Sequence, residues 1–470
     1  MRSPKSSSYL EYKSSKVKYI GRIPSGWSTV PVKRVANIFN GATPKSSEMR
    51  YWDGDVSWIT PADLGKKGRS QISRGKRNIS LEGYDSCGAS MVPEGAIILS
   101  TRAPIGTLGI AANPLCTNQG CKSLVTKKDY NSKYLYYQFL CTTEQLNVLG
   151  KGTTFLELSS SDLGSFDICN PSKDEQQQIA NFLDHETAKM DRLIEKQEQL
   201  IALLKEKRQA VISHAVTKGL NPNAPMRDSG VPWLGKVPVH WEVCKIKNVV
   251  YGIIDGPHFS PNYNDEGILF ISARNIKKDS WSFSDAKYIS EKDFEEFNKR
   301  VRPEKGDVLL TKGGTTGIAR AVDFDFPFQV WVHVAVLKTN RTKINPFFLA
   351  YTLNGTSCYE QSQLFTRGAT NNDLGLSRIA KIIFSIPSLL EQQKIVTHLD
   401  NKTFTLDLTI SKANLCIELL KERRTALISA AVTGKIDVRN WQPPNNVSNP
   451  TTEEPHELYQ ALCPEWPKSH

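Results

Sequence analysis

The sequence predicts an α/β fold in which two tandem mixed α/β domains are separated by two long helices that pair as an antiparallel intramolecular coiled coil. Two observations support this prediction. Compared with itself at an offset of 216 residues, the chain matches at 22 of 43 positions between residues 175–217 and 391–433. Each matched segment has helical periodicity and follows a block of short apolar runs separated by Gly, Pro and Asn, which is typical of mixed α/β domains.

Length and composition restrict the class of protein. The 470 residues allow about three compact units, and 39% hydrophobic and 23% charged residues are close to globular averages. No run of 18 apolar residues occurs, and the nine cysteines include no C-x-x-C pair. These features argue against a membrane span, a disulfide framework and a zinc site, and they favour a cytoplasmic protein.

The net charge of +12 is concentrated outside the matched helices. Basic excess confined to particular domains favours a polyanionic partner, most simply nucleic acid. Composition and the repeat together predict the following segments: a basic N-terminal arm (1–18, charge +4), a first domain (19–172, +5), a first spacer helix (173–218), a linker (219–232), a second domain (233–388, +4), a second spacer helix (389–436) and a flexible polar tail (437–470).

The ends of both helices can be predicted from the sequence. Ser172 and Ser388 stand three residues before Glu175 and Glu391, in a capping-box pattern. Farther along, an apolar stripe alternates steps of four and three residues, which also suits an amphipathic helix lying on a domain. Two similar helices in one chain favour pairing with each other. The predicted coiled-coil positions are Leu193, Leu200, Leu204, Val211, Cys416, Leu420 and Leu427.

Basic and small polar residues recur at matching places in the two domains. Residues 66–77 hold six cations and no acid, and a second basic run follows residues 270–273. Paired turns, at 101–106 and 312–317, and paired Gly-containing segments, at 150–154 and 367–372, also suit a polyanion, although ordinary surface loops use the same residues. The candidate DNA contacts are Lys66, Lys67, Arg69, Arg74, Lys76, Arg77, Arg102, Lys151, Thr153, Arg274, Asn275, Lys277, Lys278, Lys312, Thr315, Arg367, Asn371 and Asn372.

Sequence motifs for catalysis do not recur between the halves. The segment 312–317 is Gly-rich but lacks the order of a phosphate-binding loop. The Asn-Pro-Phe-Phe run at 345–348 resembles an amino-methyltransferase motif without its second proline, and its counterpart at 131–134 indicates a helix start. Carboxylates form no repeated nuclease cluster, and no histidine has a histidine counterpart. We therefore expect no catalytic residue and no metal site.

The motifs together resemble the specificity subunit of a Type I restriction-modification system. The resemblance extends over about residues 19–436. Its motifs are Ile23-Pro-Ser-Gly-Trp27 and Val237-Pro-Val-His-Trp241, Glu-Gln-Gln at 175–177 and 391–393, Leu-Leu-Lys-Glu at 203–206 and 419–422, and the linker from Lys218 to Gly235. The basic arm and the polar tail depart from this pattern.

The resemblance implies two target recognition domains, each reading half of a split double-stranded DNA sequence. It also implies two methyltransferase (modification) subunits and translocase/endonuclease (restriction) subunits as partners. In that case this chain holds no cofactor, and S-adenosylmethionine, ATP and Mg are expected on the partners. The alternatives are a single-chain DNA methyltransferase or nuclease and a scaffold that does not bind DNA.

Overall fold

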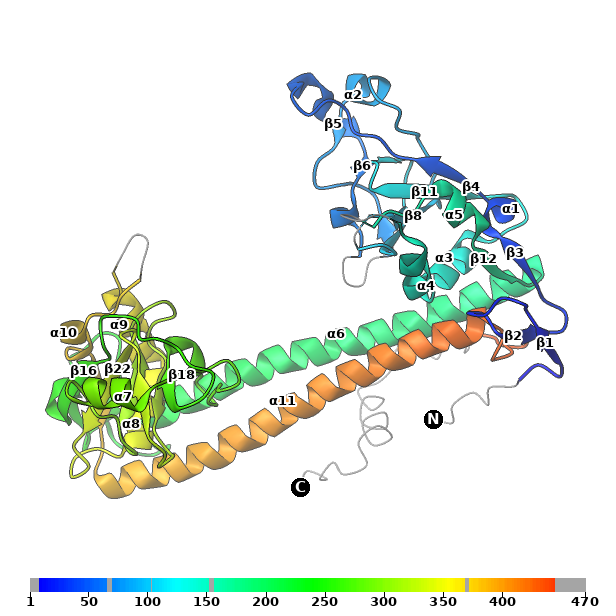
Figure 1. Cartoon of the computed structure of the whole chain (residues 1–470). Coiled ribbons are helices and arrows are strands. Elements are labelled where there is room, and N and C mark those ends of the chain that lie inside the picture. The colour runs from blue at the N-terminus through cyan, green and yellow to red at the C-terminus, as the bar shows by residue number, and fades with distance from the viewer. Residues whose placement is uncertain (1–7, 66–69, 103, 152–155, 368–371, 444–470) are drawn as a thin grey trace. The chain divides into compact units, whose positions relative to one another are not determined.

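Two long helices carry the best-matched parts of the sequence. In the computed structural model they are α6 (Lys173–Lys218) and α11 (Leu389–Val432), of 46 and 44 residues, and they pack against each other (Figure 1). The structure describes residues 8–65, 70–102, 104–151, 156–367 and 372–443. Within these ranges, no helix is long and apolar enough to cross a membrane.

The chain divides into two compact units, each of which combines an α/β domain with parts of both helices. The first unit contains residues 1–198 and 414–470, and the second contains residues 199–413. Each unit therefore holds the beginning of one long helix and the end of the other. The boundary between the two units therefore does not coincide with the boundary between the two sequence repeats, because the two long helices run in opposite directions.

A mixed five-stranded sheet forms the centre of the first unit. Its strand order is β4-β11-β8-β9-β7, and only the β7–β9 pair is parallel. The strands are β4 (Ala36–Asn40), β7 (Gln71–Ile72), β8 (Ile97–Ser100), β9 (Leu108–Ala111) and β11 (Cys121–Thr126). Around the sheet lie β1 (Tyr12–Ser14), β2 (Arg22–Pro24), β3 (Ser28–Pro31), β5 (Trp52–Val56), β6 (Trp58–Ile59), β10 (Cys116–Thr117), β12 (Asp167–Asn170), α1 (Val32–Val35), α2 (Leu81–Asp85), α3 (Ser132–Leu140), α4 (Thr143–Leu149), α5 (Ser160–Ser165) and the 3-10 turns η1 (Met49–Tyr51) and η2 (Pro61–Asp63).

The second unit repeats this arrangement with a four-stranded antiparallel sheet of order β16-β22-β19-β20. A three-stranded sheet, β18-β17-β21, lies beside it. The elements are β13 (Met226–Asp228), β14 (Lys236–Pro238), β15 (Glu242–Lys245), η3 (Ile246–Asn248), β16 (Val250–Asp255), β17 (Ile268–Ile271), η4 (Ala273–Asn275), β18 (Lys287–Ile289), α7 (Glu291–Asn298), β19 (Val308–Thr311), β20 (Ala319–Ala321), β21 (Phe328–Val330), β22 (Val334–Thr339), α8 (Pro346–Asn354), α9 (Thr356–Phe365), α10 (Leu376–Ile379) and β23 (Ile383–Ile386).

A buried glutamine joins each long helix to its α/β domain. In the first unit, Gln176 Oε1 accepts the backbone N–H of Asn131 at 2.9 Å, and Nε2 donates to the carbonyl of Pro171 at 3.0 Å. In the second unit, Gln392 makes the same bonds to Asn345 and Pro387 at 2.7 and 2.9 Å. The Glu-Gln-Gln repeat is thus explained by a joint between the long helix and the N-terminus of α3 or α8.

The predicted arm and linker each contribute the first strand of an equivalent hairpin, whose second strand lies in the domain that follows. Strand β1 pairs with β2, and β13 pairs with β14, in each case antiparallel. The segment predicted as a basic arm, residues 1–18, therefore contains an ordered strand, β1. Its residues 1–7 lie outside the described ranges. Of the predicted tail, residues 444–470 also lie outside them, but the Trp441 ring packs 5.5 Å from that of Phe182.

The buried stripe of the helix pair lies close to the predicted one. Leu420 is buried, but Leu193, Leu200, Leu204, Val211, Cys416 and Leu427 are only half-buried. The deepest burial falls one residue later at several of these positions, on Ile201, Ile212, Ile417 and Ile428. Adjacent apolar residues such as Leu200 and Ile201 make the two stripes hard to distinguish from sequence, because both have helical spacing.

Candidate nucleic-acid interface

The same loop framework occurs in both α/β domains. It consists of a parallel strand pair and the 3-10 turn that follows its first strand. In the first domain β6 pairs with β10 and leads into η2. In the second domain β17 pairs with β21 and leads into η4. The basic segment predicted to contact DNA follows η2 in the first domain and begins within η4 in the second domain.

One buried side chain closes the turn in each domain. Asp63 Oδ2 accepts the backbone N–H of Thr60 at 3.0 Å and its Oδ1 accepts that of Lys76 at 2.8 Å. Asn275 Oδ1 accepts the backbone N–H of Ser272 at 2.8 Å, while its amide donates to the Ser282 carbonyl at 2.8 Å. Asn275 is only 2% exposed. Its predicted DNA contact is thus corrected: it holds the loop from inside.

A glycine allows the sheet to approach the framework in each domain. A Cβ on Gly41 would lie 2.0 Å from the carbonyl oxygen of Asn118, and one on Gly256 would lie 2.0 Å from that of Val330. Any larger side chain would force the backbones apart. The end of β4 or β16 is therefore fixed beside the strand pair.

An ionic cluster lies at this end of the second sheet. The ammonium group of Lys312 is 3.3 Å from Asp255 Oδ2 and 3.1 Å from Asp373 Oδ1, and Arg300 also pairs with Asp255. Burial raises the pKa of Asp255, but bonds and charges from Arg300 and Lys312 outweigh burial and hold this pKa below its ordinary value. Lys312 is 6% exposed, so its predicted DNA contact is also corrected: its charge is balanced by carboxylates within the domain.

The first domain has a different polar cluster at the corresponding end. Arg102 Nη2 lies 3.1 Å from Glu157 Oε2, and its side chain is exposed. Lys122, which is buried, donates to Asn40 Oδ1 at 2.9 Å. Burial lowers the pKa of Lys122, and the charge of Glu157 opposes this shift. Sequence reasoning missed Lys122 because its acceptor is far away in the chain.

Most of the predicted contacts that the structure describes are exposed. Arg77 lies with its guanidinium carbon 4.0 Å from the centre of the Trp52 ring. Lys278 is half-buried, with its ammonium 4.4 Å from the centre of the Tyr359 ring of α9. The exposed candidates are Arg74, Lys76, Arg77, Arg102, Lys151, Arg274, Lys277, Thr315, Arg367 and Asn372. Lys66, Lys67, Arg69, Thr153 and Asn371 lie outside the described residues.

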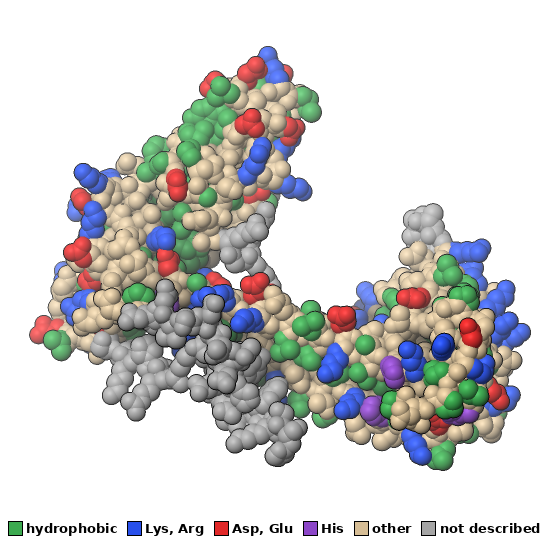
Figure 2. All heavy atoms as spheres, turned by 180° about the vertical axis from the view of Figure 1, so that it is seen from behind, with side chains coloured by type: hydrophobic (Ala, Val, Ile, Leu, Met, Phe, Trp, Pro, Cys, Tyr) green, Lys and Arg blue, Asp and Glu red, His purple; other side chains and the backbone are tan. Residues whose placement is uncertain are grey.

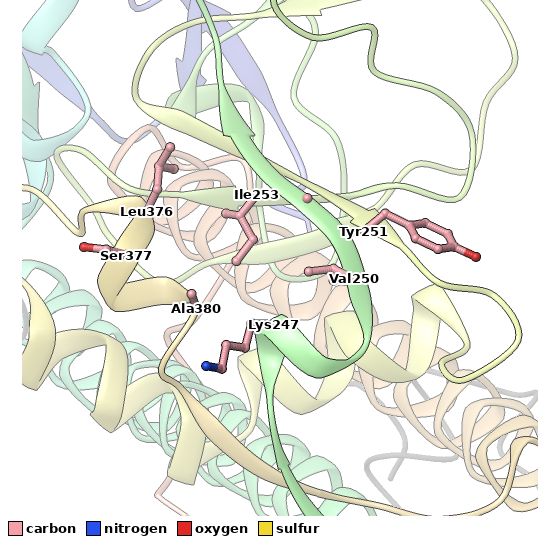
Figure 3. Close-up of a pocket in the computed structure, with 8 residues that line it drawn as sticks. Lys247, Val250, Tyr251, Ile253, Leu376, Ser377 and Ala380 are labelled. Carbon is pink, nitrogen blue, oxygen red and sulfur yellow. The ribbon is translucent and has the colours of Figure 1, made fainter.

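The described surface carries many exposed charged side chains. Lys and Arg side chains are spread over both units with acidic side chains between them (Figure 2). The open hollow of about 330 Å³ in Figure 3 lies beside the start of β16, at the opposite end of that strand from Asp255. Within the described ranges, no group of three or more His, Cys, Asp or Glu side chains is arranged to hold a metal ion.

Comparisons with known proteins identify this arrangement. The family described as "Type I restriction modification DNA specificity domain" matches residues 24–203 and 238–417. The chain is 29% identical over 432 residues to the Type I restriction enzyme MjaIX specificity subunit of Methanocaldococcus jannaschii, covering 89% of this chain and 95% of that protein. It is 24% identical to the EcoBI specificity subunit of Escherichia coli, covering 90% and 89% of the two chains.

A solved structure has the same fold. Its title is "Structural basis underlying complex assembly and conformational transition of the type I R-M system", and it matches with a TM-score of 0.67 and 16% identity over 87% of this chain and 98% of that one. Two tandem specificity domains cover more than half of the sequence. The chain belongs to the family of Type I restriction-modification specificity subunits.

Proposed function

We propose that this chain is the non-catalytic subunit that recognises a bipartite DNA sequence for a Type I restriction-modification complex. Each α/β domain reads one half-site in double-stranded DNA. The observation that carries the proposal is the duplicated loop framework. In each domain a buried side chain, Asp63 or Asn275, closes a turn, and exposed cations lie near that turn. Other side chains around the framework differ between the two domains. Phosphate contacts would position each domain, and side chains that differ between the domains would read bases.

Other subunits supply the chemistry. Two methyltransferase subunits would bring S-adenosylmethionine and methylate adenine, and translocase/endonuclease subunits would bring ATP and Mg. The relatives named as Type I restriction enzyme specificity subunits, which match along nearly their full length, support this assignment. The cytoplasm, where chromosomal DNA is available in a prokaryotic cell, is the expected compartment.

The long helices would set the spacer between half-sites. Helix α6 has 46 residues, which corresponds to about 69 Å at 1.5 Å per residue. Inserting four residues into each helix adds about 6 Å and is expected to lengthen the preferred spacer by one or two base pairs. A methylated motif with an unchanged spacer would show that helix length is not the determinant.

A genome-wide map of methylated adenines tests the proposal. A host that expresses this chain with its methyltransferase subunit is compared with a host that lacks only this chain. We expect methyladenine in one bipartite motif, which disappears when the chain is absent. If the assembled complex binds no DNA sequence selectively and methylates no motif, the proposal is refuted. Incubating the pure chain with labelled S-adenosylmethionine and DNA tests the alternative, a single-chain methyltransferase.

A further inference from the structure

The duplicated framework allows residues of the two domains to be matched one by one. The backbone N–H of Asn118 donates to the Ile59 carbonyl at 2.9 Å, and that of Trp331 donates to Ile271 at the same distance. Two residues later, the carbonyls of Gly120 and His333 each accept a backbone N–H at 2.8 Å, from Thr101 and Lys312 respectively. The residue between these fixed points is Gln119 in the first domain and Val332 in the second.

Two matched supporting positions carry residues of similar kind, whereas the turn position between the fixed points does not. Gly41 and Gly256 permit the close backbone approach, and Ser100 and Thr311 bond the backbone N–H of Thr107 and Ile318. At the turn position, where Gln119 is exposed and Val332 is half-buried, the chemistry changes from an amide to an aliphatic group. A chain that reads two different half-sites needs this combination: similar residues that hold the turn in place, and a different side chain at the turn position of each domain.

Gln119 is exposed and held in place. Its Oε1 accepts a hydrogen bond from the hydroxyl of Thr43, which follows Gly41 by two residues. On its other side, Asn118 Oδ1 accepts the backbone N–H of Gly120 at 3.0 Å and closes the turn. Among the described residues, the bond from Thr43 is the hydrogen bond of this side chain, and its amide nitrogen makes none. A supported amide with free bonding capacity can pair with a base edge at a small entropic cost.

We propose that the position of Gln119 and Val332 reads one base pair in each half-site. The amide of Gln119 bonds N6 and N7 of an adenine in the major groove, and Val332 packs against the methyl group of a thymine. This inference rests on the proposed function. It assigns the specificity to side chains that differ between the domains rather than to the cations, which contact phosphates of any sequence.

Methylation mapping of Gln119→Ala and Val332→Ala in the full complex tests the assignment. Gln119→Ala is expected to make one base pair of one half-site ambiguous and to leave the other half-site and the spacer unchanged. Val332→Ala is expected to affect one base pair of the other half-site only. For Gln119→Ala, in competition between duplexes that differ at the affected base pair, selectivity should fall roughly 10- to 100-fold. Gln177→Ala, at an exposed glutamine of α6 outside the duplicated loop framework, is the control and should leave the motif intact.

The outcomes separate this inference from the proposed function. If Gln119→Ala weakens binding to all duplexes equally, or leaves the motif unchanged, the position does not read a base and the inference is overturned. Gln119→Glu preserves the size of the side chain, so a shift of preference away from adenine in that variant supports base reading even if the alanine variant is unstable. If the unaltered chain directs no bipartite methylation, the proposed function fails, and this inference fails with it.

Discussion

The glutamine joint between helix and domain predicts a large difference between two adjacent glutamines. In Gln176→Ala, the backbone N–H of Asn131 and the carbonyl of Pro171 both lose their partner. Gln176 is 2% exposed, so water cannot replace it without structural change. Leaving buried polar groups unpaired costs about 1 to 3 kcal/mol each, so for two groups we expect a total loss of about 2 to 6 kcal/mol in the free energy of unfolding.

Gln177→Ala provides the matched control. Gln177 is exposed, and its Oε1 accepts the side-chain amide of Asn131 at 2.8 Å. Water can replace this bond, so a loss below about 1 kcal/mol is expected. For a unit of this size, the difference corresponds to roughly 4 to 20 °C in the melting temperature of the first unit.

Differential scanning calorimetry of the full chain measures both variants, and the second unit offers an independent repeat of the test. Gln392 is buried and bonds Asn345 and Pro387, whereas its neighbour Gln393 accepts the exposed Asn345 side-chain amide at 2.8 Å. Gln392→Ala should therefore destabilise much more than Gln393→Ala. Equal melting temperatures for the buried and exposed variants in either unit would refute the reasoning.

Three further predictions follow from the domains and the helix pair. Gly41→Ala should lower the melting temperature of the first unit by several degrees because the added Cβ would lie 2.0 Å from a carbonyl oxygen; Gly88→Ala, with open space around it, should not. The pKa of Asp255 in the folded chain lies below its value in the unfolded chain, which is near 4. Its ion pairs therefore stabilise the fold above about pH 4, and this stability is lost as the pH falls further. The melting temperature of Asp255→Asn should depend less on pH in that range. Replacing the exposed cations Arg74, Lys76 and Arg77 by alanine should weaken binding to all DNA sequences and flatten its salt dependence in filter-binding titrations; a change of half-site identity alone would contradict a phosphate role.

The helices and their ends could be predicted from sequence because the signals are local. The Ser172 hydroxyl accepts the backbone N–H of Glu175 at 3.3 Å, and Ser388 does the same for Glu391 at 3.4 Å, as the capping pattern indicates. A hydrogen bond between residues three positions apart can be predicted from a short stretch of sequence, because both residue types stand in the same motif. The fold class can be predicted from such local patterns together with the sequence repeat.

The detailed site could not be predicted because its contacts join distant residues. Lys312 is basic and begins a Gly-rich turn, so the sequence predicts an exposed DNA contact. Its actual partner Asp255 is 57 positions earlier. Gln119 was missed for a second reason. The offset between equivalent residues changes from 215 at Gly41 to 211 at Ser100 and 216 at Gln176. Comparison at a fixed offset therefore cannot match Gln119 with Val332.

The direction of helix pairing follows from two reciprocal ion pairs. In the first unit Arg424 of α11 lies 3.1 Å from Asp191 of α6, and in the second unit Arg208 of α6 lies 3.0 Å from Asp407 of α11. Both arginines, and both aspartates, are separated by the repeat offset of 216. In a parallel pair with the repeats in register, each arginine would face its own counterpart, and like charges would repel. In the antiparallel pair, each arginine meets the aspartate of the other repeat, so a single helical sequence used twice stabilises its own pairing at both positions.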